Sequence, residues 1–272
     1  MAEIVGLVRA LREGDDAAKA TAARALGDLA RYTDANRVLI AEAGGIPPLV
    51  DLLRDGSAAA KMTAAEALRS LACNDANMVT IAAAGGIPPL VDLLRDGSAD
   101  AKAAAAATLS NLASDNDAIR VLIAAAGAIP PLVDVVRNGS AEKWAAAALR
   151  NLACNEANRV PIAENGGIPP LVELLRDGNA GNKEQAAWAL RHLALNNSAN
   201  AVAIAAVGLE ALVELARGGR VTVNERWLVR NAGIAAKRKA ALVVAALLRA
   251  CVPEEVRSRV PYDVNTAIVS YL

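Results

Sequence analysis

The sequence contains no phenylalanine, and aromatic residues make up only 2% of its 272 residues. Hydrophobic residues nevertheless reach 54%, so a core must be built from leucine, isoleucine, valine and a large amount of alanine. Alanine is the best helix former, and small side chains let helices approach one another closely. The composition therefore predicts closely packed helices.

Histidine is almost absent too, since His192 is the single one in the chain. A histidine-based metal centre or a Ser-His-Asp triad therefore lacks the residues that it needs. No local signature supports a nucleophile pair of His192 with a cysteine. Prolines follow the paired glycines of the chain and remove the N–H groups that a phosphate loop requires. We predict no catalytic residue, no metal and no cofactor, and therefore no enzyme.

Long apolar runs are also missing. The N-terminal stretch MAEIVGLVRALREGDD has charges at positions 3, 9, 12 and 13, which interrupt any apolar block of signal-peptide length. The purely apolar run at 240–248 is far shorter than the roughly 20 residues that span a bilayer. These features predict an intracellular protein, cytoplasmic or nuclear, without a membrane span.

The net charge is zero, with 29 basic and 29 acidic residues, so the chain lacks the positive field of a general nucleic-acid binder. Residues 217–260 are an exception, because they hold ten basic and three acidic residues. Part of this segment is either a solvated face or a patch for an acidic partner. The residues of this candidate patch are Arg226, Arg230, Lys237, Arg238 and Lys239.

The chain repeats itself at a regular interval. GGIPPLVDLLRDGSA occurs word for word at 44–58 and again at 85–99, 41 residues later. Looser copies begin at Gly127, Gly166 and Gly208. A fixed period of this length is the signature of a solenoid, which grows by stacking similar units.

Each unit divides into three helical segments. A short segment such as NMVTIAAAG comes first, then IPPLVDLLRDG after a Gly-Gly turn with prolines in its first helical turn, and last a longer alanine-rich segment such as SADAKAAAAATLSNLA. An asparagine precedes most of the short segments and is well placed as an N-cap. The predicted N-caps are Asn36, Asn77, Asn158 and Asn200, with Asp117 in the unit that lacks this asparagine.

The units predict one solenoid over residues 1–252. Cys73 and Cys154 occupy equivalent places two units apart, about 20 Å at the usual spacing of stacked helices, which exceeds the roughly 7 Å limit for a disulfide. We expect buried, reduced thiols. The predicted segments are a partial first repeat (1–33), regular repeats (about 34–74, 75–115, 116–155 and 156–197), an altered terminal repeat (198–252, with an insertion at about 218–235) and a C-terminal cap or tail (253–272).

The period, the Gly-Gly-Ile-Pro-Pro-Leu-Val turn and the A-L-x-N-L-A ending of the third segment resemble armadillo repeats over about residues 3–250. HEAT repeats have a comparable period but only two helices per unit. The resemblance implies an all-α, right-handed superhelix of about five to six three-helix repeats, whose third helices line a concave groove for an extended peptide.

The resemblance also implies groove residues. In peptide-binding armadillo proteins, an asparagine near the end of the third helix bonds the peptide backbone, and a tryptophan four residues earlier packs beside the ligand. Only Asn111, Asn151 and Trp188 keep these identities, so the ladder with which importin alpha binds basic nuclear-localisation peptides is largely missing. Trp144 and Trp188 either contact a ligand or fill space between helices. The candidate groove residues are Asp28, Glu66, Ser70, Asn111, Trp144, Asn151, Trp188 and His192.

These features favour a non-enzymatic protein-interaction module that binds an extended peptide or protein segment. One alternative is a self-assembling scaffold, in which the incomplete end repeats pair with another copy. We expect the chain to be a monomer or a weak homodimer that forms through these end repeats. Another is attachment to nucleic acid or an acidic surface through the basic C-terminal region, although the zero net charge disfavours nucleic acid.

Overall fold

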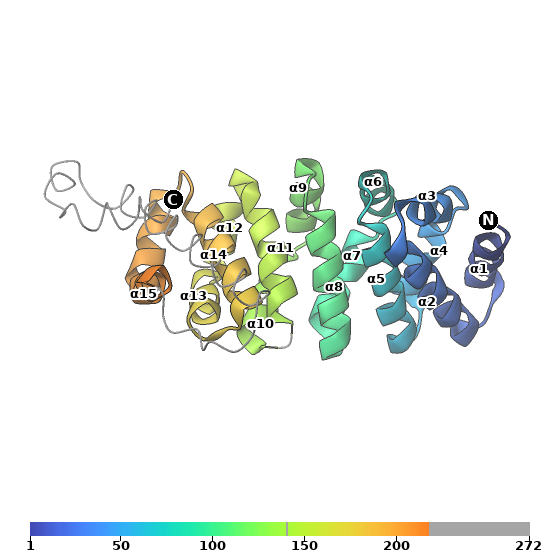
Figure 1. The fold of residues 1–272 in the computed structure, drawn as a ribbon, viewed down its shortest axis with the longest axis horizontal. Coiled ribbons are helices and arrows are strands. Elements are labelled where there is room, and N and C mark those ends of the chain that lie inside the picture. Colours follow the sequence, from blue (N-terminus) through green and yellow to red (C-terminus); the bar gives the residue numbers. More distant parts are fainter. Residues whose placement is uncertain (140, 218–272) are drawn as a thin grey trace, which may run out of the picture. The chain divides into compact units, whose positions relative to one another are not determined.

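The structure is a computed structural model that describes residues 1–139 and 141–217. Throughout these residues the regular structure is helical, without a strand (Figure 1). The chain divides into two compact units, Met1–Leu152 and Ala153–Leu272, and each is described by itself. The predicted insertion at 218–235, the end of the terminal repeat and the tail at 253–272 lie outside the described residues.

Unit 1 begins with a helix pair and continues with helices in groups of three. In each group a short first helix precedes a second helix that opens with Ile-Pro-Pro and a longer third helix. The helices are α1 (Ala2–Glu13), α2 (Asp16–Tyr32), α3 (Asp34–Glu42), α4 (Ile46–Asp55), α5 (Ala58–Leu71), α6 (Asp75–Ala83), α7 (Ile87–Asp96), α8 (Ala99–Leu112), α9 (Asp117–Ala125) and α10 (Ile129–Asn138), followed by α11 (Glu142–Cys154), which ends in unit 2.

The turn between the first and second helices depends on one glycine of each pair. Gly85 has a φ of +76°, in the left-handed region that favours glycine, and the prolines that follow occupy the first turn of α7, where a missing N–H costs nothing. Gly44, Gly127 and Gly166 have the same conformation, with φ between 73° and 77°. The predicted sharp turn is confirmed in these copies.

The N-caps of α3 and α6 lie three residues before the predicted positions, and that of α9 lies one residue before. In α6 the N-cap is Asn74, whose Oδ1 accepts a hydrogen bond from the backbone N–H of Asn77 at 3.2 Å. Thr33 caps α3 and Asn116 caps α9 in the same way, so the prediction of Asn36, Asn77 and Asp117 as N-caps is wrong. Asn158 does precede α12 but makes no capping bond, and Asn200 donates its backbone N–H to Asn197.

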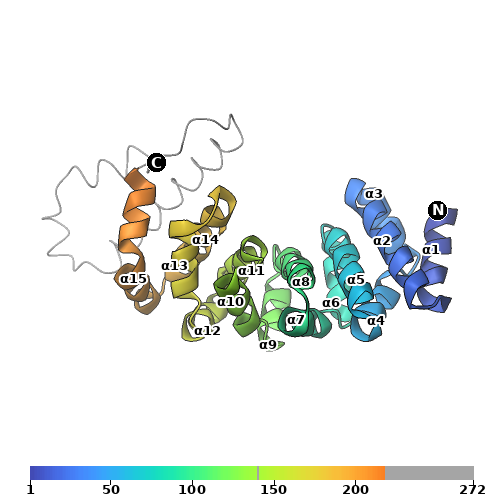
Figure 2. The ribbon, with the colours of Figure 1, turned by 90° about the horizontal axis from the view of Figure 1, so that it is seen from below.

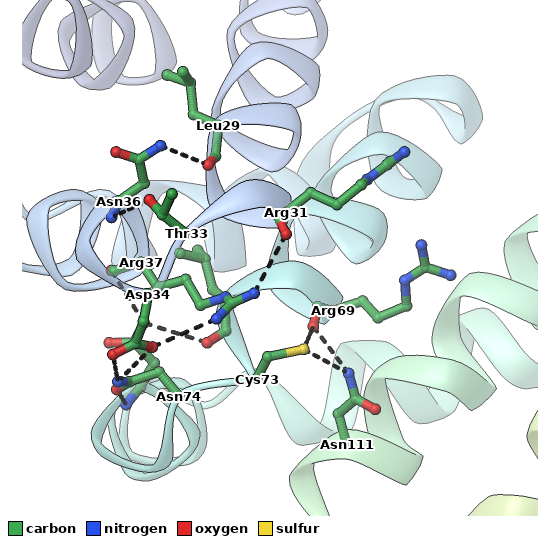
Figure 3. A network of polar contacts seen from close by, with 12 residues as sticks. Leu29, Arg31, Thr33, Asp34, Asn36, Arg37, Arg69, Cys73, Asn74 and Asn111 are labelled. Carbon is green, nitrogen blue, oxygen red and sulfur yellow. Dashed lines mark hydrogen bonds and ion pairs between the residues drawn. The ribbon is translucent and has the colours of Figure 1, made fainter.

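The asparagines that the sequence predicts as N-caps of α3 and α6 instead connect one helix to another. Asn36 Nδ2 donates to the carbonyl of Leu29 near the end of α2, at 2.8 Å (Figure 3). Asn77 Nδ2 donates to Leu71 O near the end of α5 and also to Arg37 O of α3 in the preceding repeat. An asparagine in the first turn of the first helix therefore anchors that helix to its neighbours.

The third helices α2, α5 and α8 follow one another side by side in unit 1 (Figure 1 and Figure 2). Small residues permit this approach, since a Cβ atom added to Gly27 of α2 would lie 3.1 Å from Ala67 Cα of α5. Alanines of α5 and α8 are buried together with the leucines of the second helices. The alanine-rich composition therefore determines how closely successive repeats pack.

Unit 2 continues the same order of helices. The buried Arg159 donates from its guanidinium to Ala153 O, Cys154 O and Leu195 O, and thereby connects the end of α11 with the end of α14. The elements are the 3-10 helix η1 (Glu156–Asn158), α12 (Arg159–Glu164), α13 (Ile168–Asp177), α14 (Ala180–Ala194) and α15 (Ser198–Arg217).

No single helix in the described part of the chain is long and apolar enough to cross a membrane. Two pairs, α6 with α7 and α9 with α10, reach that length and composition only together, and they are bent by 81° and 82°.

Candidate functional site

Side chains of successive third helices meet on one face of unit 1, which we call the third-helix surface. Arg69 comes from α5, Asn111 from α8 and Trp144 from α11. The guanidinium carbon of Arg69 lies 5.8 Å from the centroid of the Trp144 ring, although α8 separates the two helices in the sequence. Asn111 donates to the carbonyl of Arg69 at 3.0 Å. The surface therefore extends across three repeats.

The predicted ladder asparagines use their amide nitrogens within the protein. Asn111 Nδ2 donates to Arg69 O and lies 3.5 Å from the Cys73 sulfur (Figure 3). Asn151 Nδ2 donates to Ser110 O at 2.8 Å. Ser110 and Arg69 occupy equivalent positions of α8 and α5, so the two bonds repeat one geometry. They join each third helix to the previous one.

The two asparagines differ in what they leave for a ligand. Asn151 is 5% exposed, and its Oδ1 accepts hydrogen bonds from the Arg150 guanidinium at 2.9 and 3.0 Å. Asn111 is half-buried, and no donor among the described residues bonds its Oδ1. Asn111 thus offers an acceptor, whereas Asn151 is a buried connection.

The other candidate groove residues of unit 1 are Ser70, Glu66 and Asp28. Ser70 is 6% exposed, and its hydroxyl donates back to Glu66 O within α5. The Glu66 side chain is exposed and makes no ion pair with any described residue. Asp28 is exposed and forms an ion pair with Arg31 at 3.5 Å. These side chains lie on the third helices α2 and α5.

Unit 2 has an aromatic cluster of its own on α14. The rings of Trp188 and His192 are stacked, with centroids 5.7 Å apart and planes inclined by 15°. The Arg191 guanidinium lies 4.8 Å from the Trp188 centroid, and the Cys154 sulfur lies 3.9 Å from His192 Nε2. Trp188 and His192 therefore share one helix face, as a spacing of four residues predicts.

The prediction of buried cysteines is wrong. Cys73 is exposed and Cys154 is half-buried, although both are free thiols as expected. Each lies 38 residues before the ladder side chain that it contacts, Asn111 for Cys73 and His192 for Cys154. Cys154 is thus the last residue of α11 and Cys73 lies two residues after the end of α5, each close to a ladder side chain. Cys251 lies outside the described residues.

Two predictions concern residues outside the part of the chain that the structure describes. The candidate acidic-partner patch of Arg226, Arg230, Lys237, Arg238 and Lys239 lies outside the described residues, and so does the basic segment on which the nucleic-acid alternative depends. Within the residues that the structure describes, no group of three or more His, Cys, Asp or Glu side chains is arranged to hold a metal ion.

The stacked three-helix units and the connected third helices define the class of a helical-repeat solenoid. The family model described as the plant U-box protein ARM repeat region matches residues 3–215, so the chain belongs to the armadillo repeat family. No curated protein matches the chain.

Several solved structures of similar fold are designed armadillo repeat proteins. A designed armadillo repeat protein is 27% identical, with a TM-score of 0.78 over 90% of this chain and 99% of that chain. Computationally designed armadillo repeat proteins for modular peptide recognition give 28% identity and a TM-score of 0.77 over 89% of this chain and 99% of that chain. A designed armadillo protein in complex with the peptide (KR)4 is 27% identical, with a TM-score of 0.77 over 90% of this chain and 99% of that chain. These similarities confirm the predicted all-α armadillo solenoid.

Proposed function

We propose that the chain is a non-enzymatic protein-interaction module that binds an extended peptide or protein segment along its third helices. The observation that supports this proposal is the third-helix surface of unit 1, where Arg69, Asn111 and Trp144 from successive repeats lie together. An extended segment that crosses these helices would meet one set of side chains per repeat. The designed armadillo protein in complex with (KR)4 supports the same use of the fold.

The contacts available in this chain differ from a regular asparagine ladder. Both asparagine donors already bond the neighbouring third helix, so a ligand N–H would bond to Asn111 Oδ1. The half-buried ring of Trp144 adds apolar area for a ligand, and the Arg69 guanidinium already lies over this ring. We therefore propose that Trp144 contributes most of the affinity, with Asn111 fixing the backbone of the ligand.

A display library of random octapeptides, selected against the full chain, tests the proposal. A fluorescently labelled copy of a selected peptide is then titrated by anisotropy against the wild type and the Trp144→Ala variant. Removing a central aromatic contact typically costs about 2 kcal/mol or more, so the affinity falls about thirtyfold or more.

The control is Val121→Ala, which shortens an exposed side chain of α9 away from the third helices. It leaves the affinity unchanged. The proposal fails if the folded Trp144→Ala variant, checked by circular dichroism, binds every selected peptide as the wild type does. Asn151→Ala is unsuitable for this purpose, because Asn151 is buried and its loss lowers stability as well.

A further inference from the structure

The arginines of the second helices α4, α7 and α10 are each paired with a carboxylate of their own helix. Each lies three residues after an aspartate, a spacing that brings the two side chains to one helix face. The pairs are Arg54 with Asp51 at 3.0 Å, Arg95 with Asp92 at 3.0 Å and Arg137 with Asp134 at 2.6 Å. The positive charge of these helices is therefore offset locally.

The third-helix surface departs from this arrangement. Glu66 stands three residues before Arg69, yet the Arg69 guanidinium lies over the Trp144 ring and forms no ion pair with Glu66. The Lys143 ammonium lies 5.1 Å from the centroid of the same ring. Among the described residues, no carboxylate is within ion-pair distance of either cation. Two positive charges therefore flank one aromatic ring.

Unit 2 shows a related arrangement by itself. Arg191 lies 4.8 Å from the centroid of Trp188, and that tryptophan occupies the position three residues earlier where the second helices have an acidic residue. In α11 the corresponding residue before Arg150 is Ala147. Trp144 and Trp188 therefore each have a basic side chain over the ring, whereas Arg31 of α2 keeps an ion pair with Asp28.

We infer that the third-helix surface of unit 1 selects an acidic extended segment, whose carboxylates bind Arg69 and Lys143 while its backbone or aliphatic groups cover Trp144. This inference rests on the proposed function and specifies its ligand class. The Arg69 guanidinium presents paired N–H donors that match a carboxylate, and the ring beside it reduces its contact with water. A basic peptide such as (KR)4 would meet like charges at this surface.

Labelled octapeptides of equal length test the inference by anisotropy with the full chain. The probes are alternating Asp-Glu, alternating Ser-Asn and (KR)4, together with a single-stranded DNA octamer. At low salt the acidic peptide binds tightest, and its advantage shrinks as salt is raised, because exposed charges are screened.

Charge-removing variants locate the site. Because an exposed ion pair contributes up to about 1 kcal/mol, Arg69→Gln and Lys143→Gln each weaken the acidic peptide by up to about fivefold. Arg95→Gln removes the same charge from α7, where the arginine is paired with Asp92, and leaves binding unchanged.

The outcomes separate the two proposals. If (KR)4 or the neutral peptide binds at least as tightly as the acidic peptide and Trp144→Ala abolishes that binding, the acidic preference is wrong and the peptide-binding proposal stands. Tighter binding of the DNA octamer with the same loss in Arg69→Gln also overturns the acidic-peptide assignment. If no probe binds at up to about 1 mM, the acidic-segment inference fails, and the selected octapeptides decide the peptide-binding proposal by themselves.

Discussion

Asn77 provides a quantitative test of how the repeats are connected. Its side chain is 2% exposed, and Nδ2 donates to Leu71 O at 3.2 Å and to Arg37 O at 3.1 Å. A net intramolecular hydrogen bond contributes about 0.5–1.5 kcal/mol, so Asn77→Ala removes about 1–3 kcal/mol from the free energy of unfolding. The higher helix propensity of alanine offsets up to about 0.7 kcal/mol of this loss in the free energy of unfolding.

Asn36 is the matched control within the same chain. It occupies the equivalent position of α3, but its Nδ2 makes only the bond to Leu29 O at 2.8 Å. Asn36→Ala has the same change in helix propensity, so the difference between the two variants isolates the bond to the preceding repeat. We expect Asn77→Ala to be about 0.5–1.5 kcal/mol more destabilising than Asn36→Ala.

Urea unfolding of the full chain, followed by far-UV circular dichroism, measures both variants. Equal m-values in wild type and variants are required for the comparison, since a smaller m in Asn77→Ala would mean that repeats unfold separately. The reasoning is refuted if Asn77→Ala costs no more than Asn36→Ala, because the bond to Arg37 O would then contribute nothing to stability.

Two further predictions concern the turns and the first repeat. Gly85→Ala lowers the free energy of unfolding by about 1–2 kcal/mol, because its φ of +76° disfavours any Cβ. Urea unfolding would contradict this if the variant were as stable as the wild type. The Asp16 carboxylate accepts hydrogen bonds from Ser57, and these bonds lower the pKa of Asp16 below its usual range. Their contribution to stability is therefore present at neutral pH and is lost as the pH falls through the lowered pKa. Thermal unfolding should therefore find Asp16→Asn less stable than the wild type at pH 7 and equal to it in strong acid, and a difference that persists in acid would contradict the mechanism.

Much of the fold could be predicted because its signals are local. The left-handed glycine, the prolines of the first turn and the alanine-rich third segment each act on neighbouring backbone, so their spacing indicates where helices turn, begin and pack. Gly85 and the start of α7 at Ile87 illustrate this. The exposed aspartates of the second helices are predictable for the same reason, since a period of 3.6 residues determines which face they occupy.

The roles of the polar side chains could not be predicted in this way. An amide at Asn77 can cap its own helix or bond a carbonyl of another helix, and the sequence pattern favours neither until the neighbouring helix is in place. Asn74, three residues earlier, is the N-cap of α6. The Asn77 side chain therefore bonds carbonyls of α3 and α5 instead.

The same reason applies to the candidate site. The sequence by itself determined the repeat, the helix order and the face on which Asn111, Asn151 and Trp144 lie. Only the tertiary structure decided that the asparagine donors bond the preceding third helix and that Arg69 turns from Glu66 to the Trp144 ring. These choices depend on groups about 40 or more residues away in the chain, which stacking of the repeats brings within contact distance.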